Sequence, residues 1–152
     1  MTKNATTIQI DQISPEHCVS SNLHKAARAI TKVYEDAIRP SGIRRSQFTI
    51  LALLYRLDSV RLSVLSDRLV IDRTTLSRNL KPLQSLGLII VKPSADDARA
   101  KDICLSKNGK LKYKEALKLW SKAQKLVIKK YGSGNWRDLE VALSDLRGRV
   151  SN

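Results

Sequence analysis

Residues 73–81 carry a run of side chains that donate hydrogen bonds or bear positive charge. Leu76, Leu80 and Leu83 follow one another at spacings of four and three, which places them on one stripe of an amphipathic helix. The residues around that stripe are Arg73, Thr74, Thr75, Ser77, Arg78, Asn79 and Lys81. Side chains of these types contact phosphates and base edges, and a helix has the width of a B-DNA major groove. The segment therefore predicts a helix whose outer face binds DNA.

The charge of this face distinguishes it from an ordinary solvated helix. Exposed helix faces usually mix Glu with Lys, but this face has no acidic residue after Asp72, its expected cap. Arg78 and Thr74 are the first candidates for base contacts, because arginine bound to guanine is the commonest specific contact in the major groove. Pro82 predicts a bend later in the helix, away from its groove-facing start. A polar face that only meets solvent is the simpler alternative.

The composition of the whole chain agrees with a polyanionic partner. The 152 residues carry a formal net charge of +14 and a pI of about 10.1, a value typical of nucleic-acid-binding domains. Ribosome-bound, chromatin-like and membrane-surface proteins share this balance, so charge alone does not name the partner. The hydrophobic content of 42% is enough for a packed core and excludes a wholly disordered chain.

Several classes of protein are excluded by what the sequence lacks. No stretch approaches the roughly 18 apolar residues of a membrane helix, and residues 1–15 lack the apolar core of a signal peptide, so we expect a cytoplasmic protein with no membrane partner. Cys18, Cys104, His17 and His24 do not have the spacing of zinc ligands. No catalytic Ser/His/Asp set or phosphate-binding glycine loop is evident. We therefore expect neither a metal, nor a cofactor, nor enzymatic activity.

Capping and periodicity signals divide the chain into a short arm and six helices. Residues 1–14 predict a flexible arm, and Ser14-Pro15-Glu16 predicts a helix start. Leu88–Val91 and Asp102–Ser106 predict two strands joined by a polar turn, and Arg61-Leu62 predicts a brief edge strand. The expected helices cover residues 15–40, 47–57, 64–69, 73–85, 107–131 and 136–150, with Ser63 and Asp72 as caps of the third and fourth.

The same periodicity predicts which side chains face the core. In the second helix these are Phe48, Leu51, Ala52, Leu54 and Tyr55. The long fifth helix has its apolar positions at Leu111, Ala116, Leu119, Trp120, Ala123, Leu126 and Val127.

This order of elements resembles the multiple-antibiotic-resistance regulator (MarR) family of winged helix-turn-helix proteins over nearly the whole chain after the arm. Four segments carry the resemblance: residues 72–80, Leu86-Gly87-Leu88-Ile89, Asp97-Ala98-Arg99 and Leu105–Lys110. The last is similar to the family's Leu-Thr-x-x-Gly opening of the fifth helix, with Ser106 in place of Thr. The resemblance implies a mainly α fold with a small β wing: six helices, an antiparallel hairpin of two or three strands, and an α-helical dimerisation region from both termini.

The resemblance also implies how the chain is organised. A single protomer would cover residues 15–152, with the winged helix-turn-helix core at about 44–106 and dimerisation helices at about 15–40 and 107–150. The protein would act as a homodimer whose fourth helix enters the major groove. Its hairpin would reach the neighbouring minor groove through Arg99, because a narrow minor groove concentrates negative potential.

The hairpin departs from the family in one respect. Members often carry a second arginine a few positions before the one at the tip, where this chain has Ala95 and Asp96. We therefore expect the hairpin to bind DNA less tightly than in relatives that have both arginines. Asp97 would hold the side chain of Arg99 in place.

The region after the hairpin is rich in lysine. Residues 101–130 contain ten lysines against two acids, Asp102 and Glu115. A soluble helix face is the simpler interpretation, and long-range attraction to DNA or a partner surface is the alternative. Lys101, Lys107 and Lys110 lie close enough to the hairpin to bind a phosphate, and Lys101 with Ser63 completes the expected set of DNA-binding residues.

The resemblance implies two possible ways of sensing a signal. Many members of the family bind small aromatic acids, so His24 or Arg28 would pair with a carboxylate while Tyr34 and Trp120 would contact a ring. Some members sense peroxide through a cysteine near the start of the first helix, where this chain has Cys18. Ordinary packing between helices accounts for the same residues without any ligand.

These observations predict a sequence-specific regulator of transcription that binds double-stranded DNA. We expect a homodimeric repressor on a palindromic operator, released by a small aromatic ligand or by thiol oxidation. A sequence-neutral architectural protein that coats DNA is the alternative, because it accounts equally well for the charge.

Overall fold

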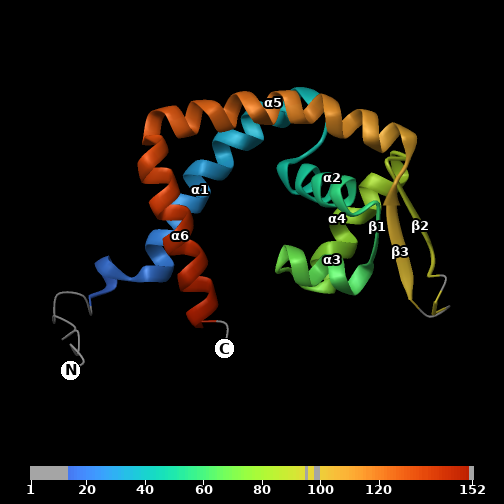
Figure 1. Cartoon of the computed structure of the whole chain (residues 1–152), viewed down its shortest axis with the longest axis horizontal. Helices are drawn as coiled ribbons and strands as arrows, with labels where there is room; N and C mark the ends of the chain where they lie inside the picture. Colours follow the sequence, from blue (N-terminus) through green and yellow to red (C-terminus); the bar gives the residue numbers. More distant parts are fainter. Residues whose placement is uncertain (1–13, 95, 98–99, 151–152) are drawn as a thin grey trace. The chain divides into compact units, whose positions relative to one another are not determined.

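A computed structural model describes residues 14–94, 96–97 and 100–150 of the chain (Figure 1). It is mainly helical, with six α-helices and three strands over these residues, as the sequence predicts. The elements in chain order are η2 (Pro15–His17), α1 (Val19–Ile38), η3 (Arg39–Ser41), α2 (Arg45–Leu57), β1 (Ser59–Arg61), α3 (Leu62–Leu69), α4 (Arg73–Ser85), β2 (Ile89–Pro93), β3 (Lys101–Leu105), α5 (Lys107–Tyr131) and α6 (Ser133–Val150). No helix in these ranges has the length and apolarity needed to cross a membrane.

The chain divides into two compact units, Met1–Val33 and Tyr34–Asn152. In the first unit, the segment at Ser14 does not open α1 as predicted. Pro15–His17 form a 3₁₀ turn, Ser14 makes no capping hydrogen bond, and α1 begins at Val19. The proline sets the backbone for a helical turn, but the turn ends at Cys18 before the long helix begins.

The sheet of the second unit has the order β1-β3-β2, with both pairings antiparallel. β2 and β3 form the predicted hairpin, in which Val91 lies opposite Ile103. On the other side of β3, Val60 lies opposite the same Ile103. The edge strand therefore covers Ser59–Arg61, one to two residues before its predicted place, because Val60 is the side chain that turns into the core.

The core lies between α2, α3, α4, α5 and the sheet. Its fully buried side chains include Leu51 and Leu54 of α2, Leu65 of α3 and the two predicted leucines Leu76 and Leu83 of α4. Burying a Leu side chain contributes about 1.5–3 kcal/mol, so these positions fix how α4 sits on the scaffold. The outer face of α4 is directed away from the core as a consequence.

Three helices begin before their predicted residues. α2 begins at Arg45, two residues before the predicted start. α3 begins at Leu62, so Ser63 lies inside the helix and is not its cap. α6 begins at Ser133 directly after Gly132, three residues before the predicted start. α4 covers its predicted residues 73–85, with Pro82 inside the helix. In α5, the apolar residues Leu111 and Leu126 are 66% and 48% exposed.

Tyr113 takes the buried place that Leu111 does not, because its ring stacks on Phe48 with centroids 5.7 Å apart. Tyr55, also predicted to face inward, is 40% exposed at the edge of this cluster, although its ring still lies 4.6 Å from that of Tyr113. Aromatic side chains can lie at the boundary of a core with one face packed and the polar tip in water, which periodicity alone does not reveal.

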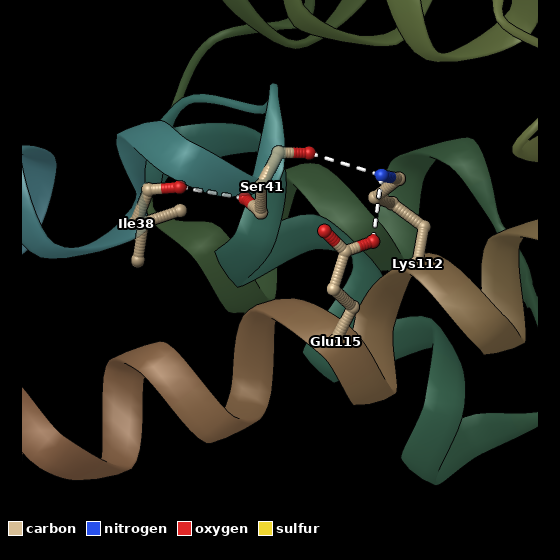
Figure 2. A network of polar contacts seen from close by, with 4 residues as sticks. All are labelled: Ile38, Ser41, Lys112 and Glu115. Atoms are coloured by element: carbon tan, nitrogen blue, oxygen red, sulfur yellow. Dashed lines mark hydrogen bonds and ion pairs between the residues drawn. The ribbon is translucent and has the colours of Figure 1, made fainter.

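Figure 2 shows how the end of the first helical region is joined to α5. The Ser41 hydroxyl donates to the Ile38 carbonyl at 2.7 Å, and Lys112 Nζ donates to the Ser41 carbonyl at 3.0 Å. Lys112 also pairs with Glu115 at 2.7 Å. The half-buried Lys112 thus satisfies a backbone carbonyl at the turn, and Glu115 is committed to the same lysine.

A second junction, at Ser106, holds α4 and the hairpin to the start of α5. The Ser106 hydroxyl donates to the Gly87 carbonyl at 2.6 Å and accepts from the Gly109 N–H at 2.9 Å, so it caps α5 as it joins the turn after α4. The Ser106 N–H donates to the Leu88 carbonyl at 3.1 Å. A Cβ built on Gly109 would lie 1.9 Å from the Leu88 carbonyl oxygen, so only glycine permits this approach.

We expect the substitution Gly109→Ala to destabilise the protein by about 1–3 kcal/mol, because the added methyl group forces apart two backbones. Gly148→Ala is the matched control: Gly148 lies in α6, nothing is within 4 Å of its Cβ position, and alanine favours a helix by about 0.5–1 kcal/mol. Urea unfolding of both variants measures the difference. Equal stabilities for the two would contradict the close approach.

Candidate nucleic-acid interface

The start of α4 is fixed by the predicted cap. Asp72 Oδ1 accepts from the Thr75 N–H at 2.8 Å, and Asp72 Oδ2 accepts from the Thr75 hydroxyl at 2.6 Å. The Thr75 side chain and then its N–H hold the pKa of Asp72 below its usual value. A lowered pKa means that this contribution to stability is present above the unfolded-state pKa and is lost only as the pH falls through the folded one. The cap is therefore charged at neutral pH.

The exposed face of α4 presents cations and small hydroxyl groups. Arg73, Thr74, Ser77, Arg78 and Lys81 are all exposed, and no residue of α4 is acidic. Within the described ranges, none of the ion pairs includes an α4 residue. The guanidinium and ammonium groups of this face are thus directed to solvent, where phosphates and base edges can reach them.

Two of the predicted DNA-binding residues are tied into the protein. The Thr75 hydroxyl donates to Asp72. Asn79 Nδ2 donates to the Thr75 carbonyl at 2.9 Å, and Asn79 Oδ1 accepts from the Ser46 hydroxyl at 3.0 Å. Asn79 therefore joins α4 to α2 through its Oδ1 and Nδ2 atoms. A contact between Asn79 and DNA stays a prediction.

A hollow of about 370 Å³ lies beside the start of α4. It is lined by Arg61, Leu62, Ser63, Arg73, Asp97, Ala100 and Lys101. The structure therefore brings together Ser63, Arg73 and Lys101, which the sequence analysis named from three separate elements. A concave site with three cationic side chains suits a phosphate group.

Arg61 is the member of this site that sequence reasoning missed. It ends β1, next to the start of α3, and pairs with Asp96 of the hairpin loop at 3.4 Å. Both side chains are substantially exposed, so this pair is weak and leaves the guanidinium available. Arg61 lies opposite Asp102 of β3, and this strand register cannot be read from the sequence alone.

A second, smaller hollow of about 150 Å³ lies along α4. Its lining includes Ser77, Lys81 and Gln84 of α4 together with Val91 and Lys101 of the hairpin strands. Lys101 lines both hollows, so they share a basic side chain between α4 and the hairpin. Arg99, the expected minor-groove residue, lies outside the described residues; Asp97, its expected support, lines the hollow.

The residues expected to bind an effector are placed only in part. Tyr34 and Trp120 stack with centroids 6.3 Å apart, and the Tyr34 hydroxyl donates to Gln124. Burial raises the pKa of Tyr34 above its ordinary value. His24 and Arg28 are exposed residues of the other unit. The structure therefore supports an aromatic cluster around Trp120, and a ligand there stays a prediction.

The candidate redox residue Cys18 is exposed at the turn before α1. Its carbonyl accepts from the Asn22 N–H at 3.0 Å and from Asn22 Nδ2 at 3.0 Å. Cys104 is half-buried in β3 between the core residues Ile103 and Leu105. The two cysteines thus differ in their access to solvent.

Comparison with known proteins places the chain among transcriptional regulators. A profile of the MarR family matches residues 41–100. The M. tuberculosis transcriptional regulator MosR, solved in complex with DNA, is 32% identical, and the match covers 88% of this chain and 96% of that one with a TM-score of 0.79. The organic hydroperoxide resistance transcriptional regulator of Bacillus subtilis is 28% identical over 72% of this chain and 74% of its own length. The repressor CouR, bound to a 23-mer DNA duplex, shares the fold at 19% identity with a TM-score of 0.80 over 91% of this chain and 99% of its own.

We expect Arg78→Ala to reduce the preference for the specific sequence. We expect Lys101→Ala or Arg61→Ala to weaken binding to all DNA sequences about equally. An arginine on a base edge discriminates by about 1–3 kcal/mol, whereas the loss of one phosphate contact lowers the salt slope by about 0.9 for every sequence alike. Titration of matched specific and scrambled duplexes over a range of salt separates the two effects.

Lys130→Ala serves as the control, because this lysine lies at the far end of α5 from the hairpin. If Arg78→Ala weakened specific and scrambled duplexes by the same factor, its assignment to a base edge would be wrong.

Proposed function

Because this chain belongs to the MarR family of transcriptional regulators, we propose that it is a sequence-specific repressor that binds a palindromic operator as a homodimer. Members of the family regulate transcription by binding DNA and are not enzymes. This chain is therefore a DNA-binding regulator of transcription. A regulator acts where the chromosome is, so we also propose a cytoplasmic location.

The observation that carries the proposal is the acid-free exposed face of α4. Arg73, Thr74, Ser77, Arg78 and Lys81 face solvent on a helix whose opposite side is locked into the core. Such a helix is rigidly held and fits the major groove, while the basic hollow beside it suits the adjoining phosphates. We propose this surface, with Arg99 of the hairpin, as the operator-binding surface.

The proposed homodimer is supported by apolar residues that a single chain leaves in water. In α1 these are Val19, Leu23, Ile30 and Val33, which are 37–62% exposed. In α6 no residue is buried, and Val141 is 66% exposed. A two-fold dimer uses the same patch on both copies, so a pair of chains would cover these helices. We accordingly propose residues 15–40 and 107–150 as the dimerisation region of a single protomer.

We propose that a signal releases the operator, by either of two routes. A small aromatic acid would bind near Tyr34 and Trp120, with His24 or Arg28 pairing with its carboxylate. Alternatively, oxidation of Cys18 would alter the start of α1. The exposure of Cys18 and the likeness to a regulator of organic hydroperoxide resistance support the second route.

Selection of bound sequences from random DNA tests the class of protein and the dimer together. We expect an inverted repeat whose half-site centres lie about 34–36 Å, one helical turn, apart, because two-fold symmetry sets that spacing. The selected site should be preferred over random competitor DNA by at least about 10³-fold. An architectural protein, which the high net charge also fits, would yield no consensus and would lose its bound DNA to the competitor in proportion to mass.

The thiol route predicts a difference between the two cysteines. Peroxide should release wild-type protein and the Cys104→Ser variant from the selected site, whereas Cys18→Ser should remain bound, because Cys18 is the exposed thiol. A gel-shift assay with and without reductant measures the effect. Release of all three proteins alike would rule out Cys18 as the sensing residue and leave the ligand route.

A further inference from the structure

Seven lysines form one continuous stripe along α5, which we call the lysine stripe. They follow one another at intervals of three or four residues, the spacing that keeps side chains on one face of a helix. Its members are Lys107, Lys110, Lys114, Lys118, Lys122, Lys125 and Lys129, and all seven are exposed. At 1.5 Å per residue the stripe is about 33 Å long, with about 5.5 Å between neighbours.

The lysine stripe lies on the side of α5 opposite to its packed face. The packed face is marked by Tyr113, Ala116 and Ala123, which are buried, and by the stacking of Tyr113 on Phe48 of α2. α2 packs against both α5 and α4, and it lies between them in Figure 1. The lysine stripe and the outer face of α4 are therefore basic surfaces on opposite sides of the second unit.

The protein supplies the stripe with no neutralising charge of its own in the described ranges. Glu115, the one acid of α5, lies off the stripe and is paired with Lys112. Lys112 is also off the stripe and bonds the Ser41 carbonyl (Figure 2). Among the described residues, none of the ion pairs includes a lysine of the stripe.

This arrangement is unfavourable unless a polyanion neutralises it. Like charges three and four residues apart destabilise a helix, and here they are repeated along six turns with one acid, Glu115, which is paired with Lys112. A duplex carries one negative charge per roughly 1.7 Å of axis, and each phosphate paired with a lysine releases counterions. Lysines are flexible point charges that cannot read base edges in a fixed geometry, so binding would be independent of sequence.

We propose that the lysine stripe binds the phosphate backbone of a second DNA segment while α4 holds the operator, so that the protein bridges two duplexes. The inference rests on the proposed function in one respect: when α4 holds the operator, the DNA connected to that operator is kept at high local concentration around the protein. An anionic membrane surface fits less well, because an interfacial helix inserts an apolar face and here that face is packed against α2. Leu111 and Leu126 are the exposed leucines of α5, and each lies beside lysines of the stripe.

The test compares two triple variants with equal loss of charge. The first removes the middle of the stripe: Lys114→Gln, Lys118→Gln and Lys122→Gln. The control removes three exposed lysines off the stripe: Lys25→Gln, Lys32→Gln and Lys130→Gln. Because both sets of lysines lie in the proposed dimerisation region, sedimentation first establishes that each variant has the same oligomeric mass as wild type. The selected operator duplex is immobilised, each protein is loaded on it, and capture of a labelled scrambled duplex is measured over a range of salt.

We expect wild type and the control to capture the second duplex and the stripe variant to lose that capture, with equal operator binding by all three. The salt slope of capture should fall by up to about 2.7 for three lost phosphate contacts. Equal capture by stripe variant and control, or no capture by wild type bound to its operator, would overturn the proposal. Retention on phosphatidylserine vesicles without capture of DNA would overturn it too, in favour of a membrane surface.

Failure of the operator test leaves the proposal testable on its own. If selection yields no operator, the proposed function fails, and the same proteins are compared on scrambled duplex alone. A lower affinity and a smaller salt slope for the stripe variant than for the control would then support the stripe as a DNA-binding surface. Equal values for both would overturn it.

Discussion

The structure depends on one close approach between backbones, where the start of α5 lies against the turn after α4. Gly109 provides the space, since any side chain there would meet the Leu88 carbonyl, and Ser106 provides the hydrogen bonds. One hydroxyl thereby caps α5 and also satisfies the Gly87 carbonyl beyond the end of α4. Because β3 runs directly into this junction, α4, the hairpin and the long helix α5 are held in one geometry. The Leu-Ser-x-x-Gly sequence at residues 105–109 supplies the serine and the glycine that this approach requires.

This unit carries two basic surfaces of different kinds, one on α4 and one on α5. On α4 the cations are mixed with hydroxyl groups and backed by a hollow, a combination that can fix a duplex in register and distinguish bases. On α5 the cations are lysines alone, regularly spaced and convex, a combination that can attract phosphate without reading sequence. The excess of positive charge is therefore spread over two surfaces of different chemistry, which a net charge or a pI cannot separate.

The sequence predicts best those elements for which several local signals agree. Asp72 caps α4 and the helix covers its predicted residues, because a cap, an apolar stripe and a following glycine all lie within a few turns of chain. The predicted caps Ser14 and Ser63 do not cap the expected helices, so a capping residue type alone is not sufficient. Arg61 was missed as a member of the basic hollow, because its place depends on the register of β1 against β3, some forty residues away in the chain. The buried place of Tyr113 was missed for a similar reason, because it depends on contact with Phe48 of α2.

A row of aromatic rings provides the mechanical connection that a released state would have to change. Tyr34, Trp120, Phe48, Tyr113 and Tyr55 follow one another with centroids 4.6–6.3 Å apart, from the end of α1 through α5 to α2. Rings in contact leave no free volume for α5 to slide on α2, since packed interiors move between discrete arrangements and do not deform continuously. The Ser46–Asn79 hydrogen bond then joins α2 to α4. A signal that repositioned the rings around Trp120 would therefore change the orientation of α4 as a whole. In a dimer, this change would alter the distance between the two α4 helices, which must match the spacing of the operator half-sites.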